Sequence, residues 1–513
     1  MANGTIPNKK FRAIIIGSGV TGLIAAHTFH KAGINYDVYE KWQEAAPPLG
    51  ASISVFPHCL RVLKQLGIAE EVLKLSTPFT DGASNRGPNG KLIMNVDLWG
   101  FFRENHGADV LLLERRALLD VLYQTLPDKA KVHFNKKVVR TTETRDSVEV
   151  FFADGTSEKG DIIVGADGVH SVVREAMWDY ANSVSPGLIT VEEKKSIMTN
   201  WTCLFGYGPG IPNQRNELSV TSFDGQRCFL VATQPDKTFF FVFWKPVKPW
   251  SRYARPKYTA ADAETAAASV AELPVNETMV FAELWKKRYR AQLADIEEGV
   301  LSRWHFSRHV LVGDAAHKVT PNMALGGNLG MESVFVLVNR LRQALVDSAN
   351  EGKVNGLSTL QLKTVFEQYQ AQQHPRAMAI LNISSAVSNA QAWATPWIKF
   401  SSMYIAPHAD PRAITNVLGE IVRRGSVLDF LPLDHDWIKG KLPWENGVED
   451  AYRAAVSVAK SNDASPYAIS PRPPTVLLPQ SFKLAVGMLQ AYMSYCRALV
   501  TEHRRPTGNG VVV

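Results

Sequence analysis

The sequence predicts an α/β protein with a Rossmann-like domain, an inserted β-rich domain and a helical C-terminal extension. Three observations predict this fold. An apolar run at residues 11–16 leads into a glycine-spaced turn and a helix, strand-like segments dominate residues 186–300, and helical patterns follow from about residue 329. Alternating strand and helix patterns favour a parallel sheet, whereas consecutive strands favour a separate antiparallel one.

The glycine turn directly follows the first apolar strand. Gly17 permits a sharp turn, Gly19 lets backbone N–H groups approach a pyrophosphate, and Gly22 lets the helix at 23–32 pack closely on the strand. Glu40 ends the next apolar run, 18 residues after Gly22, where a carboxylate can accept hydrogen bonds from a ribose. Strand, turn, helix and acid together predict a site for an adenine dinucleotide.

Apolar periodicity and turn residues place the remaining elements. The expected helices are 59–66, 117–126, 329–348 and about 359–390, and the expected strands are 111–113, 132–140, 147–152, 160–164, 218–222, 228–233 and 239–244. Residues 76–106 read as loop and strand. The run at 239–244 is almost entirely aromatic, which fits either a second hydrophobic core or a wall of a substrate site. Both interpretations can hold on opposite faces of one strand.

Charge and cysteine content exclude several classes of protein. The net charge of +7 is spread over 513 residues without a long basic run, so we expect no nucleic-acid partner. Four cysteines lie far apart without a C-x-x-C pair, which predicts no disulfide framework and no metal site. The first strand begins soon after residue 10 and no long uncharged apolar stretch follows. We therefore expect a cytoplasmic protein without a membrane span.

The C-terminal region differs from the rest of the chain in composition. Residues 462–480 contain five prolines and read as a linker, and residues 481–500 carry an apolar helical stripe. Such a stripe can dock on the protein itself or lie on a membrane surface, with docking favoured. Peripheral membrane contact through this helix therefore stays open.

Two further motifs extend the dinucleotide prediction to a flavin. One runs from Gly165 through Asp167 to Arg174, and the other from Asp314 through His317 to the glycines at 326–327. With the first turn, this set resembles the class A flavoprotein monooxygenases, the family of para-hydroxybenzoate and salicylate hydroxylases. It is similar in particular to fungal FAD-dependent epoxidases of indole-diterpene and meroterpenoid pathways. The resemblance covers roughly residues 11–395.

The resemblance implies a role for several residues at an FAD site. Asp314 would hold the ribityl chain, and Gly326 and Gly327 would let the backbone approach the isoalloxazine edge. A helix starting near residue 328 would direct its positive end toward the anionic reduced ring. Arg115 would lie near the flavin and its phosphates, with Arg116 as the competing assignment.

The resemblance also suggests roles for several further residues. Gly50 and Ala51 resemble a small-residue approach to the cofactor. Asp167 and Arg174 resemble a motif that links FAD binding to reaction with NAD(P)H, and an Asp–Arg pair at a helix start is the structural alternative. Tyr207 aligns with a catalytic tyrosine of some relatives. A buried, hydrogen-bonded histidine is favoured over a proton shuttle for residue 317.

The family pattern implies a division of the chain. An FAD-binding domain (GR2-type) would consist of residues 1–80, 107–185 and 296–395. The substrate domain would consist of residues 81–106 and 186–295. Residues 396–513 would form a C-terminal extension with the proline-rich linker and the terminal helix.

The resemblance implies an FAD-dependent monooxygenase that uses NADPH or NADH and O₂, through a C4a-hydroperoxyflavin. No second Gly-x-Gly-x-x-Gly unit follows the first, so NAD(P)H should bind transiently. The leading hypothesis is epoxidation of a prenyl olefin on a small lipophilic terpenoid or meroterpenoid intermediate of secondary metabolism. Two alternatives stay open: an aromatic hydroxylase of the salicylate type and a non-catalytic escort of prenyl lipids.

Overall fold

A computed structural model of the chain describes residues 11–47, 50, 52–246, 249–251, 256–352, 356–434 and 437–445. The linker predicted at 462–480 and the helix predicted at 481–500 lie outside these residues. No helix within the described ranges combines the length and the apolar character that crossing a bilayer requires.

A six-stranded sheet forms the centre of the Rossmann-like half, in the order β18-β19-β11-β1-β2-β7. Its strands are β1 (Arg12–Ile16), β2 (Asn35–Tyr39), β7 (Val132–His133), β11 (Ile162–Gly165), β18 (His305–Phe306) and β19 (His309–Leu311). β1 pairs in parallel with β2 and β11, and β11 pairs in parallel with β19. The expected α/β fold is confirmed. The pairing also brings the ends of three distant motif strands to one edge.

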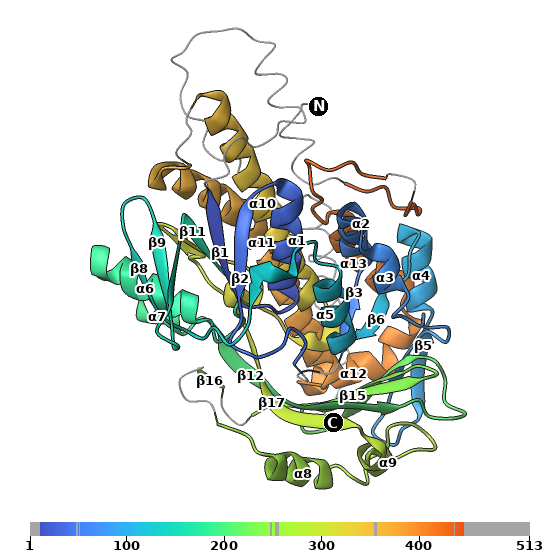
Figure 1. Cartoon of the computed structure of the whole chain (residues 1–513). Helices are drawn as coiled ribbons and strands as arrows, with labels where there is room; N and C mark the ends of the chain where they lie inside the picture. Colours follow the sequence, from blue (N-terminus) through green and yellow to red (C-terminus); the bar gives the residue numbers. More distant parts are fainter. Residues whose placement is uncertain are drawn as a thin grey trace, which may run out of the picture.

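Long helices pack against this sheet (Figure 1). They are α1 (Val20–Ala32), α10 (Gly326–Asn350) and α11 (Thr359–Gln391), with α2 (Pro57–Leu66), α3 (Ala69–Leu73), α5 (Arg115–Gln124), α6 (Val172–Val184) and α7 (Val191–Lys194) around them. Small residues set the approach of α10 to α1, because a Cβ added at Gly330 would lie 2.7 Å from Oγ1 of Thr21. The helices expected at 329–348 and 359–390 are both present as single helices, and each is slightly longer than predicted.

Two predicted strands are each divided in the structure. Residues 132–140 form two strands, β7 and β8 (Val138–Glu143), because Asn135 adopts a left-handed conformation with φ of 58° and ends the first strand. β7 joins the parallel sheet, while β8 pairs with β9 (Val148–Phe152), which pairs with β10 (Ser157–Gly160). The strand expected at 160–164 is likewise divided between β10 and β11.

A nine-stranded sheet forms the second half of the molecule. Its strands are β4 (Ala83–Arg86), β5 (Leu92–Val96), β12 (Met198–Pro209), β13 (Leu218–Phe223), β14 (Arg227–Thr233), β15 (Lys237–Trp244), β16 (Trp250–Ser251), β17 (Arg290–Val300) and β20 (His317–Lys318). Two short helices, α8 (Ala260–Ala268) and α9 (Phe281–Lys287), lie below this sheet in Figure 1.

The aromatic strand β15 serves both faces of the large sheet. Phe240 is buried against Phe281 of α9, with ring centroids 5.5 Å apart, and belongs to a second hydrophobic core. Phe241 and Phe243 point to the opposite face, where they line a cavity. Because side chains alternate along a strand, one aromatic run supplies both a core and a cavity wall. The interpretation as a second core is therefore confirmed, and the opposite face lines a cavity, where the substrate wall stays a prediction.

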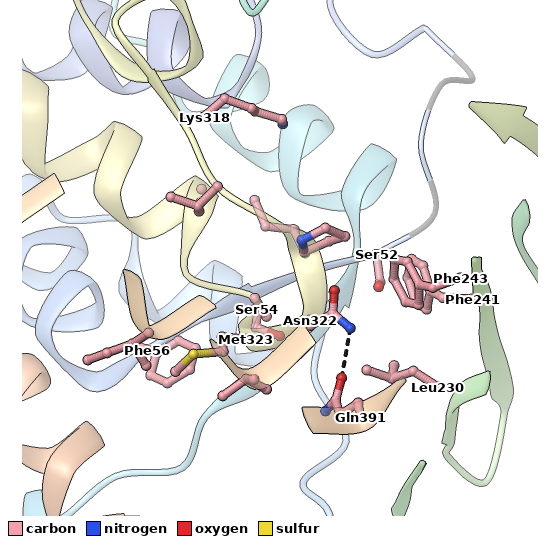
Figure 2. A pocket seen from close by; sticks show the side chains of 18 of the residues that line it. Ser52, Ser54, Phe56, Leu230, Phe241, Phe243, Lys318, Asn322, Met323 and Gln391 are labelled. Carbon is pink, nitrogen blue, oxygen red and sulfur yellow. Dashed lines mark hydrogen bonds between the residues drawn. The ribbon is translucent and has the colours of Figure 1, made fainter. Parts of the chain in front are cut away.

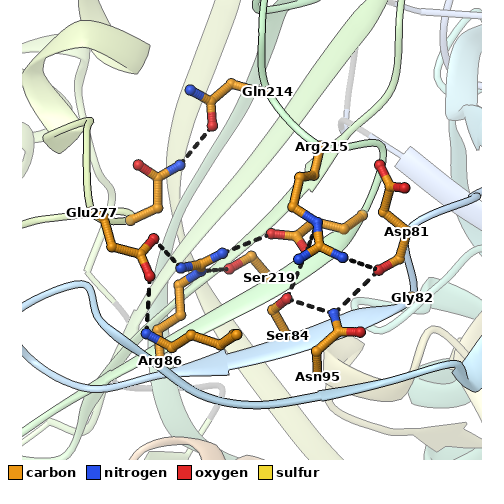
Figure 3. A network of polar contacts seen from close by, with 12 residues as sticks. Asp81, Gly82, Ser84, Arg86, Asn95, Gln214, Arg215, Ser219 and Glu277 are labelled. Carbon is orange, nitrogen blue, oxygen red and sulfur yellow. Dashed lines mark hydrogen bonds and ion pairs between the residues drawn. The ribbon is translucent and has the colours of Figure 1, made fainter.

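A buried charge network attaches the β4–β5 hairpin to the large sheet (Figure 3). Arg86 on β4 donates to Glu217 at 3.0 Å and to the Ser219 hydroxyl at 3.0 Å, and it also pairs with Glu277. Ser84 donates to the other oxygen of Glu217 at 2.6 Å. Two carboxylates thus compensate one buried guanidinium, which fixes the parallel register of β4 against β13.

Three further helices and a two-stranded sheet cover the end of the molecule nearest the cavity. The helices are α4 (Leu98–His106), α12 (Pro396–Tyr404) and α13 (Arg412–Arg423), and the strands are β3 (Ser52–Val55) and β6 (Leu111–Glu114). Helix α4 corrects the expectation of loop and strand up to residue 106. Asp97 caps its start by accepting from Gly100 N, and Gly107 ends it with a left-handed φ of 73°.

Candidate active site

The glycine turn has the geometry that its spacing predicts. Gly17 has a φ of 101°, and a Cβ at Gly22 would lie only 1.9 Å from the Gly17 carbonyl oxygen. Gly19 precedes α1 without a side-chain cap, so the first N–H groups of the helix are left for other acceptors. Residues 17–21 line the large cavity. This arrangement can receive a phosphate group at the positive end of α1.

Glu40 lies at the end of β2, beside the same turn. Its Oε2 accepts hydrogen bonds from Ser18 N at 2.7 Å and from the Ser18 hydroxyl at 3.1 Å, and its Oε1 accepts from Trp42 N at 3.0 Å. The carboxylate is 7% exposed and lines the cavity. It therefore braces the glycine turn, and its remaining lone pairs can accept from a ribose.

Asp314 follows β19 in a short 3₁₀ turn at Gly313–Ala315. Its Oδ2 accepts from Lys318 Nζ at 2.5 Å, and both side chains line the cavity. Burial alone would lower the pKa of Lys318, but the Asp314 carboxylate outweighs it and raises that pKa. The sequence analysis did not single out Lys318, although its i, i+4 spacing from Asp314 is the signal that could have identified it.

The structure separates the two candidate arginines. Arg115 lines the cavity, where burial lowers the pKa of its guanidinium while Asp314 and Glu40 oppose that shift. Arg116 is exposed and lies 4.0 Å from Glu44. Gly50 has a φ of 80°, and a Cβ there would lie 3.0 Å from Cδ of Arg115. Ala51 lies outside the described residues.

Arg174 connects the motif at residues 165–174 with the motif that begins at Asp314. Asp167 Oδ2 accepts from Val172 N at 2.7 Å at the start of α6, and burial raises the pKa of this carboxyl. Arg174 lies in the first turn of α6. Its guanidinium donates to the carbonyl of Ala315 at 2.9 Å and to the carbonyl of Val169 at 2.6 Å. These bonds link two motifs that lie more than 140 positions apart in the sequence.

His317 has the environment of a framework residue. It is 1% exposed, and its Nε2 lies 2.7 Å from the Ser333 hydroxyl, which itself donates to Leu329 O. Burial lowers the pKa of His317 to about 4. A neutral, hydrogen-bonded histidine agrees with the favoured interpretation and does not suit a proton shuttle near neutral pH.

Gly326 and Gly327 begin α10 at the cavity. The helix starts without a side-chain cap, and a Cβ at Gly327 would lie 2.7 Å from Cδ1 of Ile53. Asn328 fixes this region to β3, since its Oδ1 accepts from Phe56 N at 2.9 Å and its Nδ2 donates to Ser54 O at 2.9 Å. The positive end of α10 is therefore held beside the backbone of β3.

The position of Tyr207 does not support a catalytic role. Tyr207 lies on β12, and its hydroxyl donates to Oε1 of Glu114 at 3.2 Å. The ring contacts Tyr289, which is 65% exposed, and Tyr207 is not among the residues that line the cavity. The catalytic role of Tyr207 therefore stays a prediction from the resemblance, without support from its position.

A single continuous cavity of about 2780 Å³ connects all these motifs to the large sheet. Ligand pockets usually measure about 300–1,000 Å³, so this one has room for a dinucleotide and a second molecule. Its far end, which we call the apolar chamber, lies against the sheet and the end of α11. The chamber is lined by Leu230, Phe241, Phe243, Met378, Val387 and Trp397, several of them drawn in Figure 2. The aromatic run at 239–244 points to Phe241 and Phe243, and no local motif marks the other residues of the chamber.

Comparisons with known proteins agree with this geometry. The model of the FAD binding domain family matches residues 10–384. An FAD-dependent monooxygenase DEP2 of Fusarium langsethiae is 41% identical over 387 residues, covering 75% of this chain and 73% of the relative. The DEP2 protein of Alternaria brassicicola is 39% identical over 445 residues, covering 85% and 82%.

Solved structures share the fold at low sequence identity. Klebsiella pneumoniae HpxO complexed with FAD and uric acid has a TM-score of 0.63 at 20% identity, and the match covers 80% of this chain and 96% of that one. FqzB has a TM-score of 0.60 at 18% identity, with coverage of 80% and 93%. The chain belongs to the FAD binding domain family and is an FAD-dependent monooxygenase.

Proposed function

We propose that this monooxygenase epoxidises a prenyl olefin on a lipophilic terpenoid or meroterpenoid intermediate of secondary metabolism, with NADPH or NADH and O₂ as cosubstrates. The observation that carries the proposal is the apolar chamber, which continues directly from the glycine turn and Asp314 into a wall of aromatic and aliphatic side chains. A long prenyl group can bury its surface there, and each buried CH₂ contributes about 0.8 kcal/mol.

The residues at the nucleotide end fit FAD. The α1 N-terminus with Gly17 and Gly19 would hold the pyrophosphate, and Glu40 would accept from the ribose. Arg115 would neutralise phosphate charge, and Asp314 would accept from the ribityl hydroxyls. Bound FAD, once reduced by the nicotinamide, supplies the activation of O₂.

The second motif and the start of α10 complete this assignment. Asp167 would link the FAD site to the reaction with NAD(P)H through the α6 N-terminus. Gly326 and Gly327 would leave room for the ring edge, and the positive end of α10 would favour negative charge there. Gly50 and Gly22 would act through the backbone, by keeping Arg115 and α1 close to the cavity.

The chamber favours epoxidation over phenol hydroxylation. An alkene needs orientation and exclusion of water, whereas a phenol benefits from a base near its hydroxyl. Among the described residues of the chamber and its mouth, Asp410 and Glu420 are carboxylates, and both are engaged. Asp410 accepts from Arg412 N at 2.9 Å, and Glu420 pairs with Arg423 at 2.8 Å. The chamber therefore offers an apolar surface that can orient an alkene, in preference to a general base.

The division into FAD-binding segments 1–80, 107–185 and 296–395, substrate-domain segments 81–106 and 186–295, and an extension from 396 remains part of this proposal. The pairing of β4 with β13 supports the separation of residues 81–106 from their sequence neighbours. The extension contributes α12, from which Trp397 and Ile398 line the chamber.

The product formed from a defined probe tests this function. The FAD-loaded enzyme is incubated with a farnesylated phenol, ¹⁸O₂, and NADPH or NADH, and the labelled product is located by mass spectrometry. We expect one ¹⁸O atom on a prenyl double bond and substrate-stimulated oxidation of the nicotinamide. Oxygen on the aromatic ring would replace the epoxidase assignment with hydroxylation. No substrate-stimulated oxidation would contradict the proposal as a whole.

A further inference from the structure

Two amide side chains meet inside the apolar chamber (Figure 2). Asn322, in the turn Pro321–Met323, donates from Nδ2 to Oε1 of Gln391 at 2.7 Å, and Gln391 is the last residue of α11. Both line the cavity, and Asn322 is 9% exposed. Neither Oδ1 of Asn322 nor Nε2 of Gln391 has a hydrogen-bond partner among the described residues. The pair therefore presents a free acceptor at its Asn322 end and free N–H donors at its Gln391 end, with the hydrogen bond between them.

Apolar side chains flank this pair on two sides, and Ser52 and Ser54 also line the pocket. In Figure 2, Phe241 and Phe243 lie on one side of the amides, and Phe56 and Met323 lie on the other. A polar group that loses water without gaining a partner costs about 1–3 kcal/mol. When a lipophilic molecule fills the chamber and displaces water, the free donor and acceptor therefore need polar atoms of that molecule.

The Asn322–Gln391 bond is not required to hold its two segments together. One turn earlier on α11, the Ser388 hydroxyl meets the Thr320 hydroxyl at 2.8 Å, and both residues are buried. This second bond already joins the same loop to the same helix. Ser388 and Thr320 do not line the cavity, so the two bonds differ in their access to a ligand.

The backbone beside each amide is strained. Ala324 has a φ of 55° and Trp393 a φ of 47°, each two residues after one member of the pair. Left-handed conformations of non-glycine residues cost about 1–3 kcal/mol and persist where the surrounding structure imposes them. A bulky side chain such as that of Trp393 is uncommon in this region. The fold thus maintains an unfavourable backbone on both sides of the amide pair.

We propose that the Asn322–Gln391 pair is a hydroxyl-recognition site, which selects lipophilic substrates that carry an alcohol or phenol group. A hydroxyl both donates and accepts, so it can donate to the free Asn322 oxygen or accept from the free Gln391 nitrogen. A hydrocarbon satisfies neither. This inference rests on the proposed function, because it names a feature of the substrate that the chamber accepts.

Matched probes test the site. The FAD-loaded enzyme is titrated with a farnesylated phenol and with the analogue in which hydrogen replaces the hydroxyl, and binding is followed by flavin absorbance. We expect the wild type to bind the phenol about tenfold more tightly. In the variant Asn322→Ala/Gln391→Met the ratio should fall to about two or less, mainly through the phenol. A matching rise in KM for the phenol, larger than the fall in kcat, would identify recognition.

Two further variants separate recognition from structure. Ser388→Ala breaks the neighbouring bond and should keep the tenfold ratio. Gln391→Glu keeps an oxygen that accepts from Asn322 but removes the free donor, so it should lower the ratio while the thermal unfolding midpoint stays close to that of the wild type.

The outcomes distinguish this inference from the proposed function. An equal affinity of the wild type for both probes, or a preference that survives the double variant, would overturn the hydroxyl site, while oxygenation of both probes would still support the epoxidase. Failure of the flavin-loaded wild type to bind or oxygenate either probe would overturn both.

Discussion

The nucleotide end and the apolar chamber share one cavity but are built in different ways. At the nucleotide end, backbone groups and short motifs form the wall. A Cβ at Gly22 would lie only 1.9 Å from the carbonyl oxygen of Gly17. In the chamber, side chains from the large sheet, α11 and α12 form the wall. The first region has no room for a Cβ at Gly17 or Gly22, whereas the second can change its shape with each substitution.

This difference explains how one fold serves many substrates. Backbone contacts suit a dinucleotide, so the nucleotide end requires glycine at fixed spacing. In the chamber, side chains recognise a molecule that varies between substrates. The residues of the chamber therefore need only a suitable volume and polarity. Substitutions at the two ends should therefore fail in different ways, and the following predictions test that comparison.

The largest effect is expected at the glycine turn. Gly22→Ala places a methyl group against the Gly17 carbonyl and should yield protein that is unfolded or lacks flavin. Flavin absorbance after purification and thermal unfolding measure this. Gly33→Asn, at the other end of α1, is the control, because a Cβ at Gly33 meets nothing within 4 Å and asparagine tolerates its φ of 73°. A yellow, stable Gly22→Ala variant would contradict the close approach.

Alanine substitutions of two adjacent phenylalanines test whether the two faces of β15 differ in their contribution to stability. Phe240→Ala removes a ring that packs on Phe281 and should lower the free energy of unfolding by about 3–5 kcal/mol. Phe241→Ala removes a ring that faces the cavity and should cost about 1 kcal/mol while altering the KM for prenylated probes. Denaturant unfolding and steady-state kinetics check the pair. Equal losses of stability would show that the two faces are not distinct.

A smaller effect is expected at Asp314. Asp314→Ala removes a charge-assisted acceptor and leaves Lys318 without its carboxylate, which should weaken FAD binding by roughly tenfold to hundredfold. Quenching of FAD fluorescence on titration gives the dissociation constant. Asp224→Ala breaks an exposed pair with Lys399 and should leave FAD affinity unchanged. Full flavin occupancy in Asp314→Ala would assign the ribityl contact to another residue.

The smallest effect is a pH dependence from His317. Its pKa is lowered to about 4 in the folded protein against about 6.5 unfolded, so the unfolded chain binds more protons between these values. Stability from this residue is complete above pH 6.5 and is lost as the pH falls toward 4. Between pH 7.5 and 5.5 the loss is about 1.4 kcal/mol. His317→Gln should reduce this slope in denaturant unfolding at several pH values, and an unchanged slope would assign it to other groups.

The nucleotide end was largely predictable from the sequence because its physics is local. Gly17, Gly22 and Glu40 stand at spacings that the turn itself imposes, and the structure places them together. The position of Tyr207 does not support its assignment, which depended on alignment within a β-rich region that offers no fixed spacing. Helix α4 was missed although Asp97 and Gly107 carry its capping signals.

By itself, the sequence determined the α/β class, the order of the three motifs and the two-sided character of the aromatic strand. Only the tertiary structure decided which arginine lines the cavity, how Arg174 joins two motifs, and that Asn322 meets Gln391. Contacts between residues tens to hundreds of positions apart depend on how helices and sheets pack. Periodicity and spacing report only the few residues on either side of each position.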